Sequence, residues 1–395
     1  MRRIVNLNFL TASAIVFAMI AYGSLYPFAF HQPEYGLGPV RTLIGTWNNP
    51  PRHGDFIVNM LFYAPFGFFG VMAIRAEFGL IRRLLVILLA SAALSIILEL
   101  AQYFDRGRVT SAQDVYANLL GTAIGALAGV LLGPGLRWRF LARANKPFPG
   151  LILAAWLGYR LFPFMPEFNL HKYWNALKPI LLQPGLTSYD LFRYTVSWLT
   201  VCALVEALTE RKRSLRLFPV LALAVLVAKI VIVGKFLSAA EILGAGFAFA
   251  LWCLLINRPE RLRAAIIATL LCVYVISWRL EPFEFGDHAR AFGWVPFLEF
   301  MRGSVIVNAQ SFLEKVFYYG ALIWLITMAG ARLRTAAIGV ALVLFATSLA
   351  ELRLPGRSAG VTDGVIALFV AILVAALRPA GLPARSRAVA PRRNP

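Results

Sequence analysis

The chain has 395 residues, of which 59% are hydrophobic and only 15% are charged, and its formal net charge is +20. Soluble globular proteins average about 25% charged residues, so this composition excludes the soluble globular class. The basic residues lie mostly in short segments between apolar stretches, which is typical of membrane proteins and argues against a nucleic-acid-binding surface.

Twelve apolar stretches follow one another along the chain. About 20 helical residues cross the hydrocarbon core of a bilayer, so the sequence predicts an all-α integral membrane protein with about twelve transmembrane helices. The predicted spans are 9–28, 56–74, 83–103, 114–133, 150–165, 189–208, 216–234, 237–256, 264–280, 310–330, 335–352 and 361–378.

The basic residues are distributed unequally between the two sets of alternating connections. Of the 39 Lys and Arg, 23 fall in the termini and every second connection, 11 fall in the other connections, and five lie inside spans. Lys and Arg mark the cytoplasmic side of a membrane protein. The sequence therefore predicts that both termini are cytoplasmic, which agrees with an even number of spans.

Three similar turns divide the spans into groups of four. Each turn carries Pro-Phe at the end of the first span of its group. Each group also has a charged residue near the end of its third span. A basic residue then precedes the fourth span, and an acidic residue six positions later lies at the start of that span. The pattern predicts a four-helix repeat with intact motifs at 1–148, degenerate repeats at 149–258 and 259–378, and a basic cytoplasmic tail at 379–395 that is expected to be disordered. The turns are Tyr26-Pro27-Phe28, Phe162-Pro163-Phe164 and Glu281-Pro282-Phe283; the charges are Glu99, Lys229 and Glu351; the pairs are Arg108 with Asp114, Lys235 with Glu241, and Arg357 with Asp363.

The first repeat holds the densest set of polar residues. Helical spacing places Asp55 and Asn59 on one face of the second span, and Glu99 and Gln102 on one face of the third. The fourth span carries a stripe of Asp114, Asn118, Gly121 and Gly125, whose glycines would let a neighbouring helix approach closely.

Acidic groups that face hydrocarbon cost several kcal/mol, so we expect Asp55, Glu99 and Asp114 to meet Arg108 inside the bundle, near the outer membrane surface. Such a polar basin predicts a binding site with Arg108 as a fork for an anion or phosphate. Glu99 and Asp114 are the candidates for general acid or base. The alternative is a structural ion pair of Arg108 with Glu99 or Asp114, with Asn59 and Gln102 hydrogen-bonded between helices.

Other chemistry has little support in the sequence. The four histidines lie in loops and never pair at metal-ligand spacing, and the three cysteines lie in apolar stretches. Phosphate-binding, dinucleotide-binding and nucleophile motifs are missing from the sequence. We therefore expect no metal, no cofactor and no nucleic-acid partner.

Taken together, the polar motifs of the first repeat resemble the VanZ-like family. They are Asp55-x3-Asn59, Pro65-Phe66-Gly67, Glu99-x2-Gln102 and Arg108-x5-Asp114-x3-Asn118-x2-Gly121-x3-Gly125, over roughly residues 15–135. The family is named for a small membrane protein associated with resistance to the glycopeptide teicoplanin, and a typical member has one such unit. The resemblance implies a role in the bacterial cell envelope rather than a particular reaction.

Three functional hypotheses follow. In the first, the outward polar site, made of Asp55, Asn59, Glu99, Gln102, Arg108, Asp114 and Asn118, binds an envelope lipid or glycan headgroup, such as a lipid-linked precursor, and affects glycopeptide sensitivity. In the second, a membrane enzyme acts on such a headgroup. In the third, the chain is a transporter or flippase. In each case, membrane lipids are partners and the chain is a multi-pass protein of the cell membrane, or of the inner membrane in an organism with two.

Overall fold

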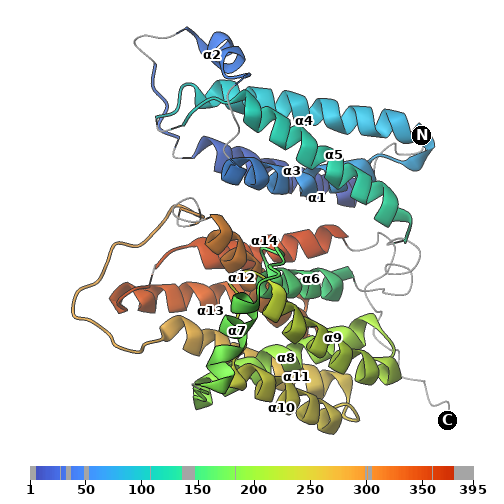
Figure 1. Ribbon diagram of the computed structural model, residues 1–395, viewed down its shortest axis with the longest axis vertical. Coiled ribbons are helices and arrows are strands. Elements are labelled where there is room, and N and C mark those ends of the chain that lie inside the picture. Colours follow the sequence, from blue (N-terminus) through green and yellow to red (C-terminus); the bar gives the residue numbers. More distant parts are fainter. Residues whose placement is uncertain are drawn as a thin grey trace, which may run out of the picture. The chain divides into compact units, whose positions relative to one another are not determined.

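Figure 1 shows the computed structural model of the chain, which is helical throughout its described part. The structure describes residues 6–377 except 27, 33–36, 49–52, 107, 136–146, 183, 299, 301–304 and 358. Its helices are α1 (Leu7–Leu25), α2 (Pro39–Gly45), α3 (His53–Ala73), α4 (Leu80–Gln102), α5 (Ala112–Gly135), α6 (Pro147–Leu161), α7 (Leu170–Leu181), α8 (Ser188–Leu208), α9 (Arg211–Val231), α10 (Ala239–Leu255), α11 (Glu260–Leu280), α12 (Val305–Met328), α13 (Leu333–Ala350) and α14 (Thr362–Leu377), with 3-10 turns at Ala76–Phe78 and Glu351–Arg353.

Six helices in the described residues are long and apolar enough to cross a membrane, namely α4, α5, α8, α9, α11 and α13. The outer faces of α4 and α5 carry aliphatic side chains such as Ile81, Leu89 and Leu131, which are 72%, 67% and 76% exposed. Lipid solvates such a surface at no cost, whereas water does not. These observations confirm the prediction of an all-helical membrane protein, although not the number of spans.

Each of the twelve predicted spans coincides with an α-helix, with ends that differ by a few residues. Three further statements stay predictions: all twelve helices cross the bilayer, they form three repeats, and both termini are cytoplasmic. Helices α2 and α7, which are short and lie in the connections that follow α1 and α6, were not predicted from the sequence.

The chain packs as two compact units, which are residues 1–134 with 375–395 and residues 135–374. We call residues 1–134 the N-terminal unit and residues 135–374 the second unit. In the N-terminal unit, α1 packs against α3 and α4 around Ile20, Tyr63 and Leu94.

Two glycines of α5 lie directly against the backbone of α3. A Cβ atom on Gly121 would lie 2.1 Å from the backbone oxygen of Met60, and one on Gly125 would lie 1.8 Å from that of Ala64. Real Cβ atoms do not approach oxygen so closely, so only glycine fits at these two positions. The predicted role of the glycine stripe is confirmed.

The second unit is built around two helices that are buried on every side. In α8 the buried run extends from Val196 to Val205, and in α12 it extends from Val316 to Leu325. Helix α6 packs on α12, while α10 and α11 pack on α8. The predicted repeats at 149–258 and 259–378 therefore share one core.

Candidate functional site

The C-terminal end of α4, the N-terminal end of α5 and the segment between them carry most of the predicted site residues. Glu99 is only 3% exposed, and its Oε2 atom accepts a hydrogen bond from the Ser111 backbone N–H at 2.7 Å. Thr110 Oγ1 donates to the Glu99 backbone oxygen at 3.1 Å. These contacts fix the Glu99 carboxylate beside the start of α5, where Asp114 lies in the first helical turn and is an electrostatic neighbour of Glu99.

Gln102 and Arg108 bind the end of α1 instead of each other. Gln102 Nε2 donates to the Ser24 backbone oxygen at 2.9 Å. Arg108 Nε and Nη2 donate to the backbone oxygens of Tyr26 and Gly23, both at 2.8 Å. Carbonyls at a helix C-terminus lack intrahelical partners and carry partial negative charge, so an arginine there is stabilising.

The predicted roles of Arg108 as an anion fork or as the partner of Asp114 stay predictions, and its partners in the structure are backbone carbonyls. Within the described residues Arg108 forms no ion pair with Glu99, because its Nε and Nη2 atoms are already bound to carbonyls of α1. In this position Arg108 ties the segment after α4 to the end of α1. Fewer of its N–H groups are then left to bind an anion.

Asn118 lies one helical turn further into the bundle than Asp114. Its Nδ2 donates to Ser95 Oγ at 2.8 Å, while its Oδ1 is buried and has no hydrogen-bond partner among the residues that the structure describes. Behind it, Ser91 and Thr122 hydroxyls lie 2.7 Å apart. Polar contacts between α4 and α5 thus continue inward from the acidic residues.

The other two predicted site residues lie on α3. Asn59 is half-buried there. Asp55 falls in the first turns of α3, and its side chain lies outside the described residues. The structure therefore brings Glu99, Asp114 and Asn118 together, while the membership of Asp55 and Asn59 in the site stays a prediction.

Asp105 is a buried acid that was not among the predicted site residues. It is 2% exposed, its Oδ1 accepts from the Ala29 backbone N–H at 3.0 Å, and its Oδ2 has no hydrogen-bond partner in the described part of the chain. Residues 29–31 and 104–106 pair through backbone hydrogen bonds, which bury Asp105. We call Glu99, Asp105, Asp114 and Asn118 the acidic end of the N-terminal unit.

The segment of α2 and the residues after it lies against the start of α5. Thr46 Oγ1 accepts from the Ala112 backbone N–H at 2.9 Å, and Gln113 Nε2 donates to the Trp47 backbone oxygen at 2.9 Å. The rings of Trp47 and Tyr116 meet edge to face with centroids 5.0 Å apart. The connection between α1 and α3 therefore covers part of the acidic end.

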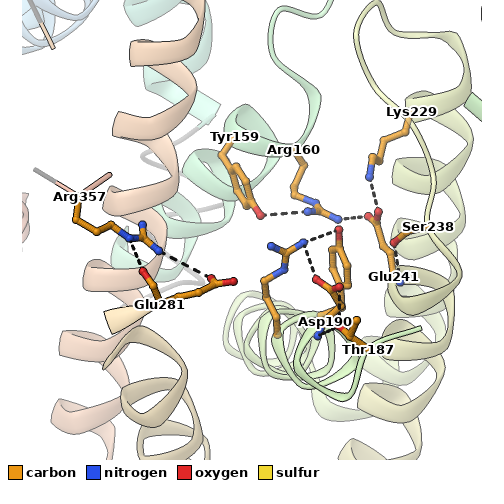
Figure 2. A network of polar contacts seen from close by, with 11 residues as sticks. Tyr159, Arg160, Thr187, Asp190, Lys229, Ser238, Glu241, Glu281 and Arg357 are labelled. Carbon is orange, nitrogen blue, oxygen red and sulfur yellow. Dashed lines mark hydrogen bonds and ion pairs between the residues drawn. The ribbon is translucent and has the colours of Figure 1, made fainter. Parts of the chain in front are cut away.

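The second unit contains a buried ion-pair network, which Figure 2 shows. Arg160, from the end of α6, and Lys229, from the last turn of α9, both bind the carboxylate of Glu241. Glu241 is fully buried in the first turn of α10, whose N-cap residue Ser238 accepts a hydrogen bond from the Glu241 backbone N–H. Arg160 also donates to Tyr159 Oη at 3.1 Å.

The second unit also contains two less buried ion pairs, and Figure 2 labels their residues Asp190, Glu281 and Arg357. Arg193 contacts Asp190 at 3.4 Å, and Arg357 contacts Glu281 at 3.8 Å. Arg357 Nε and Nη2 also donate to the backbone oxygens of Glu281 and Trp278 at 2.8 and 2.7 Å.

A second buried network involves α11, α12 and α14. Arg279, in the last turn of α11, binds Asp363 and contacts Glu351 at 2.9 Å. Lys315 contacts the other oxygen of Asp363 at 2.7 Å. Each buried acid of these two networks is therefore neutralised by a basic side chain, whereas the hydrogen bonds that the described residues donate to the carboxylates of Glu99 and Asp105 come from backbone N–H groups.

No group of three or more potential metal ligands occurs among the described residues. Residues 9–133 match the model of the VanZ/LLP1 family. This match covers the acidic end and the packing of α5 on α3, and it ends before the second unit. No curated protein and no solved structure matches the chain.

Proposed function

We propose that this membrane protein, whose residues 9–133 belong to the VanZ/LLP1 family, binds the headgroup of an envelope lipid or lipid-linked glycan at the acidic end of the N-terminal unit. Through this binding it would change the exposure of that envelope component and the sensitivity of the cell to glycopeptides. The acidic end lies within the residues that match the family, and the match does not extend to the paired networks of the second unit.

The observation that carries the proposal is a set of buried acceptors without sufficient donors. Glu99 is 3% exposed and has one backbone N–H as its partner, while Asp105 Oδ2 and Asn118 Oδ1 have no partner among the described residues. Leaving a buried polar group unsatisfied costs about 1–3 kcal/mol, and more when it is charged. A ligand that brings hydroxyl or ammonium donors would recover this free energy.

Local geometry supports the hypothesis of three four-helix repeats. Phe28, Phe164 and Phe283 have φ angles of 61°, 61° and 64°, and each backbone N–H donates to the carbonyl three residues earlier. Arg108 and Arg357 make the same two contacts, one with the residue before the proline and one with the residue three positions further back. Unrelated helical turns would not share this set of contacts.

The backbone pairing also changes the alignment of the repeats. His31 and Glu167 donate to the backbone oxygens of Phe104 and Val231, four residues before Arg108 and Lys235. This register aligns Lys229 and Glu351 with Gln102, and not with Glu99 as the charge pattern had indicated. The counterparts of Glu99, Asp105 and Asn118 are then apolar or small residues: Leu226, Ile232 and Ala245 in one repeat, and Ser348, Leu354 and Ala367 in the other.

One further difference separates the repeats. Three positions before the proline of each turn lie Ser24, Arg160 and Arg279. In the later repeats this arginine binds the acid that opens the fourth helix. The corresponding position of the N-terminal unit is Ser24, so an external group with ammonium or hydroxyl donors would take the place of the arginine beside Glu99 and Asp105.

The proposal is tested by complementing a deletion strain with the variant Glu99→Gln. This change removes the charge while keeping the shape, so we expect the variant to reach the membrane at the wild-type level and to fail to restore lipid and cell-wall composition and glycopeptide sensitivity. Arg106→Gln, at an exposed position of the same connection, is the matched control and should complement. Full complementation by Glu99→Gln would overturn the proposal.

A membrane enzyme is the second candidate, because Glu99 and Asp114 are close enough to interact electrostatically and could act as acid and base. In that case Asp114→Asn would bind the headgroup with near-normal affinity but would not convert it. If the protein only binds the headgroup, neither the wild type nor Asp114→Asn will form a product. Lipid analysis of the purified proteins incubated with envelope lipids distinguishes the two cases.

A further inference from the structure

Helix α7 is held at the level where membrane helices of the second unit end. Lys172 Nζ donates to the Lys235 backbone oxygen at 2.6 Å, and the Leu237 backbone N–H donates to the Ala176 backbone oxygen at 3.0 Å. Residues 235 and 237 lie in the connection between α10 and α9, and α9 is long and apolar enough to span the bilayer. In Figure 1, α7 runs across the direction of α6. A membrane span ends near the lipid headgroups, so a helix attached there lies close to the bilayer surface.

Two faces of α7 are defined by burial. Lys172 and Ala176, four residues apart, are buried against the rest of the second unit. Leu170, Trp174 and Leu181 form a second face, which is apolar and 83%, 47% and 60% exposed. Their spacing of four and seven residues puts them on one side of the helix, so they form a continuous apolar stripe.

The third face of α7 is polar and exposed. It consists of His171, Asn175 and Lys178. Because His171 and Asn175 each follow a residue of the apolar stripe, this polar stripe is turned from the apolar one by about 100° around the helix axis. A helix surrounded by water would expose no apolar stripe, and a helix surrounded by acyl chains would carry no polar one. The two stripes side by side are typical of a helix that lies in the interface between lipid and water.

The individual residues fit the two sides of such an interface. Tryptophan is enriched where acyl chains meet headgroups, because its ring is apolar while its N–H can bind polar groups, and Trp174 lies within the apolar stripe. Lys178, on the polar stripe, carries the positive charge that attracts lipid phosphates.

The N-terminal unit has a similar element in the corresponding connection. Val40 and Ile44, four residues apart in α2, are exposed, and so is Arg41 beside them. Thr46, directly after α2, binds the backbone N–H of Ala112 at the start of α5, another helix that is long enough to span the bilayer. An exposed apolar stripe attached to the end of a span therefore occurs in both units.

We infer that α7 lies in the plane of the membrane interface, with Leu170, Trp174 and Leu181 between the acyl chains of one leaflet and Lys178 among the headgroup phosphates. The partner of the exposed apolar face is thus lipid and not another protein. This surface is separate from the acidic end of the N-terminal unit and does not depend on the function proposed for it.

The test measures the environment of spin labels on the full chain in vesicles of phosphatidylethanolamine and phosphatidylglycerol. In a variant whose three native cysteines are replaced by alanine, Leu170→Cys and Leu181→Cys carry the label on the apolar face. Asn175→Cys and Lys178→Cys carry it on the polar face and are the matched controls. Oxygen concentrates among acyl chains, whereas a water-soluble nickel chelate stays outside the bilayer. We expect the ratio of oxygen to nickel collision rates to be several times higher on the apolar face than on the polar face.

Two results would overturn the inference, once thermal unfolding has established that each labelled variant is folded. Equal collision rates with the nickel chelate on both faces would mean that the apolar face lies in water. Low collision rates with both reagents at Leu170→Cys and Leu181→Cys would mean that protein covers this face, and spin–spin broadening of the spectrum would then identify that protein as a second copy of the chain.

Discussion

At the scale of single residues, the two units treat buried acids in opposite ways. Glu241 is bound by Arg160 and Lys229, and Asp363 is bound by Arg279 and Lys315. Removing one partner of a buried ion pair typically costs about 3–5 kcal/mol, so these networks stabilise the fold only as long as they stay complete. In the N-terminal unit, the position that corresponds to Arg160 and Arg279 is Ser24, which carries no charge.

This contrast predicts the effect of Ser24→Arg. The new guanidinium would lie where Arg160 and Arg279 lie in the two later predicted repeats, and it would occupy the acidic end in place of a ligand. We expect the variant to be at least as stable as the wild type in thermal unfolding and to lose complementation of the deletion strain. Ser24→Ala keeps the backbone carbonyl that Gln102 binds and should complement. A folded Ser24→Arg variant with full activity would argue that the acidic end has no ligand.

Part of the site could be predicted at this scale and part could not. Helical spacing placed Glu99 and Asp114 at the same end of neighbouring helices, because charged groups in an apolar segment avoid lipid. The partners of Arg108 are backbone carbonyls, which carry no residue-type signal in a sequence. Asp105 is buried through backbone pairing between residues 29–31 and 104–106, and such long-range pairing leaves no local pattern.

At the scale of elements, the contact of α5 with α3 determines the shape of the N-terminal unit. Gly125 is surrounded by backbone atoms of Ala64, which cannot move aside as a flexible side chain can. Any side chain at this position must push α5 away from α3, and this movement would also displace Asn118, which lies on α5.

Gly125→Ala should therefore lower the free energy of unfolding by about 1–3 kcal/mol or more, as measured by thermal unfolding in detergent. Gly23→Ala in α1 is the matched control, because nothing lies within 4 Å of its Cβ position. Alanine is a better helix former than glycine, so this control should be neutral or slightly stabilising. Equal losses for both variants would show that the close contact is not what stabilises the unit.

Long apolar stretches predicted their helices well, because a bilayer imposes both length and composition. The short helices α2 and α7 could not be predicted in this way. Helix α7 has twelve residues, and its Lys172 Nζ donates to the Lys235 backbone oxygen at 2.6 Å while Phe168 and Leu170, at its start, are each 83% exposed. Its position depends on that tertiary contact and on the apolar surroundings, neither of which a hydropathy window detects.

At the scale of the whole molecule, the sequence predicted three repeats, and the described residues pack as two compact units. The core that joins 149–258 to 259–378 depends on contacts such as α6 with α12 and Glu206 with Arg263. Periodicity along a chain indicates which faces are apolar but not which helix covers them. For this reason the sequence could suggest three repeats, which stay a prediction, but not the grouping of the helices into two units.

The membrane orientation is a prediction of the charge distribution. In a variant without Cys202, Cys253 and Cys272, a cysteine at Arg106 should react with an impermeant thiol reagent from outside the cell, and a cysteine at Lys212 should react only after the membrane is opened. Labelling of position 106 from the cytoplasmic side alone would move the acidic end to the inner surface and contradict an outward-facing site.

The central claim is that Glu99 belongs to a ligand site, and a direct binding measurement tests it best. Wild-type protein and Glu99→Gln should be purified from the native membrane and compared by native mass spectrometry and lipid analysis. The account predicts that a headgroup with amino or hydroxyl donors stays bound to the wild type and is lost from the folded Glu99→Gln variant. Identical bound lipids in both proteins would contradict it.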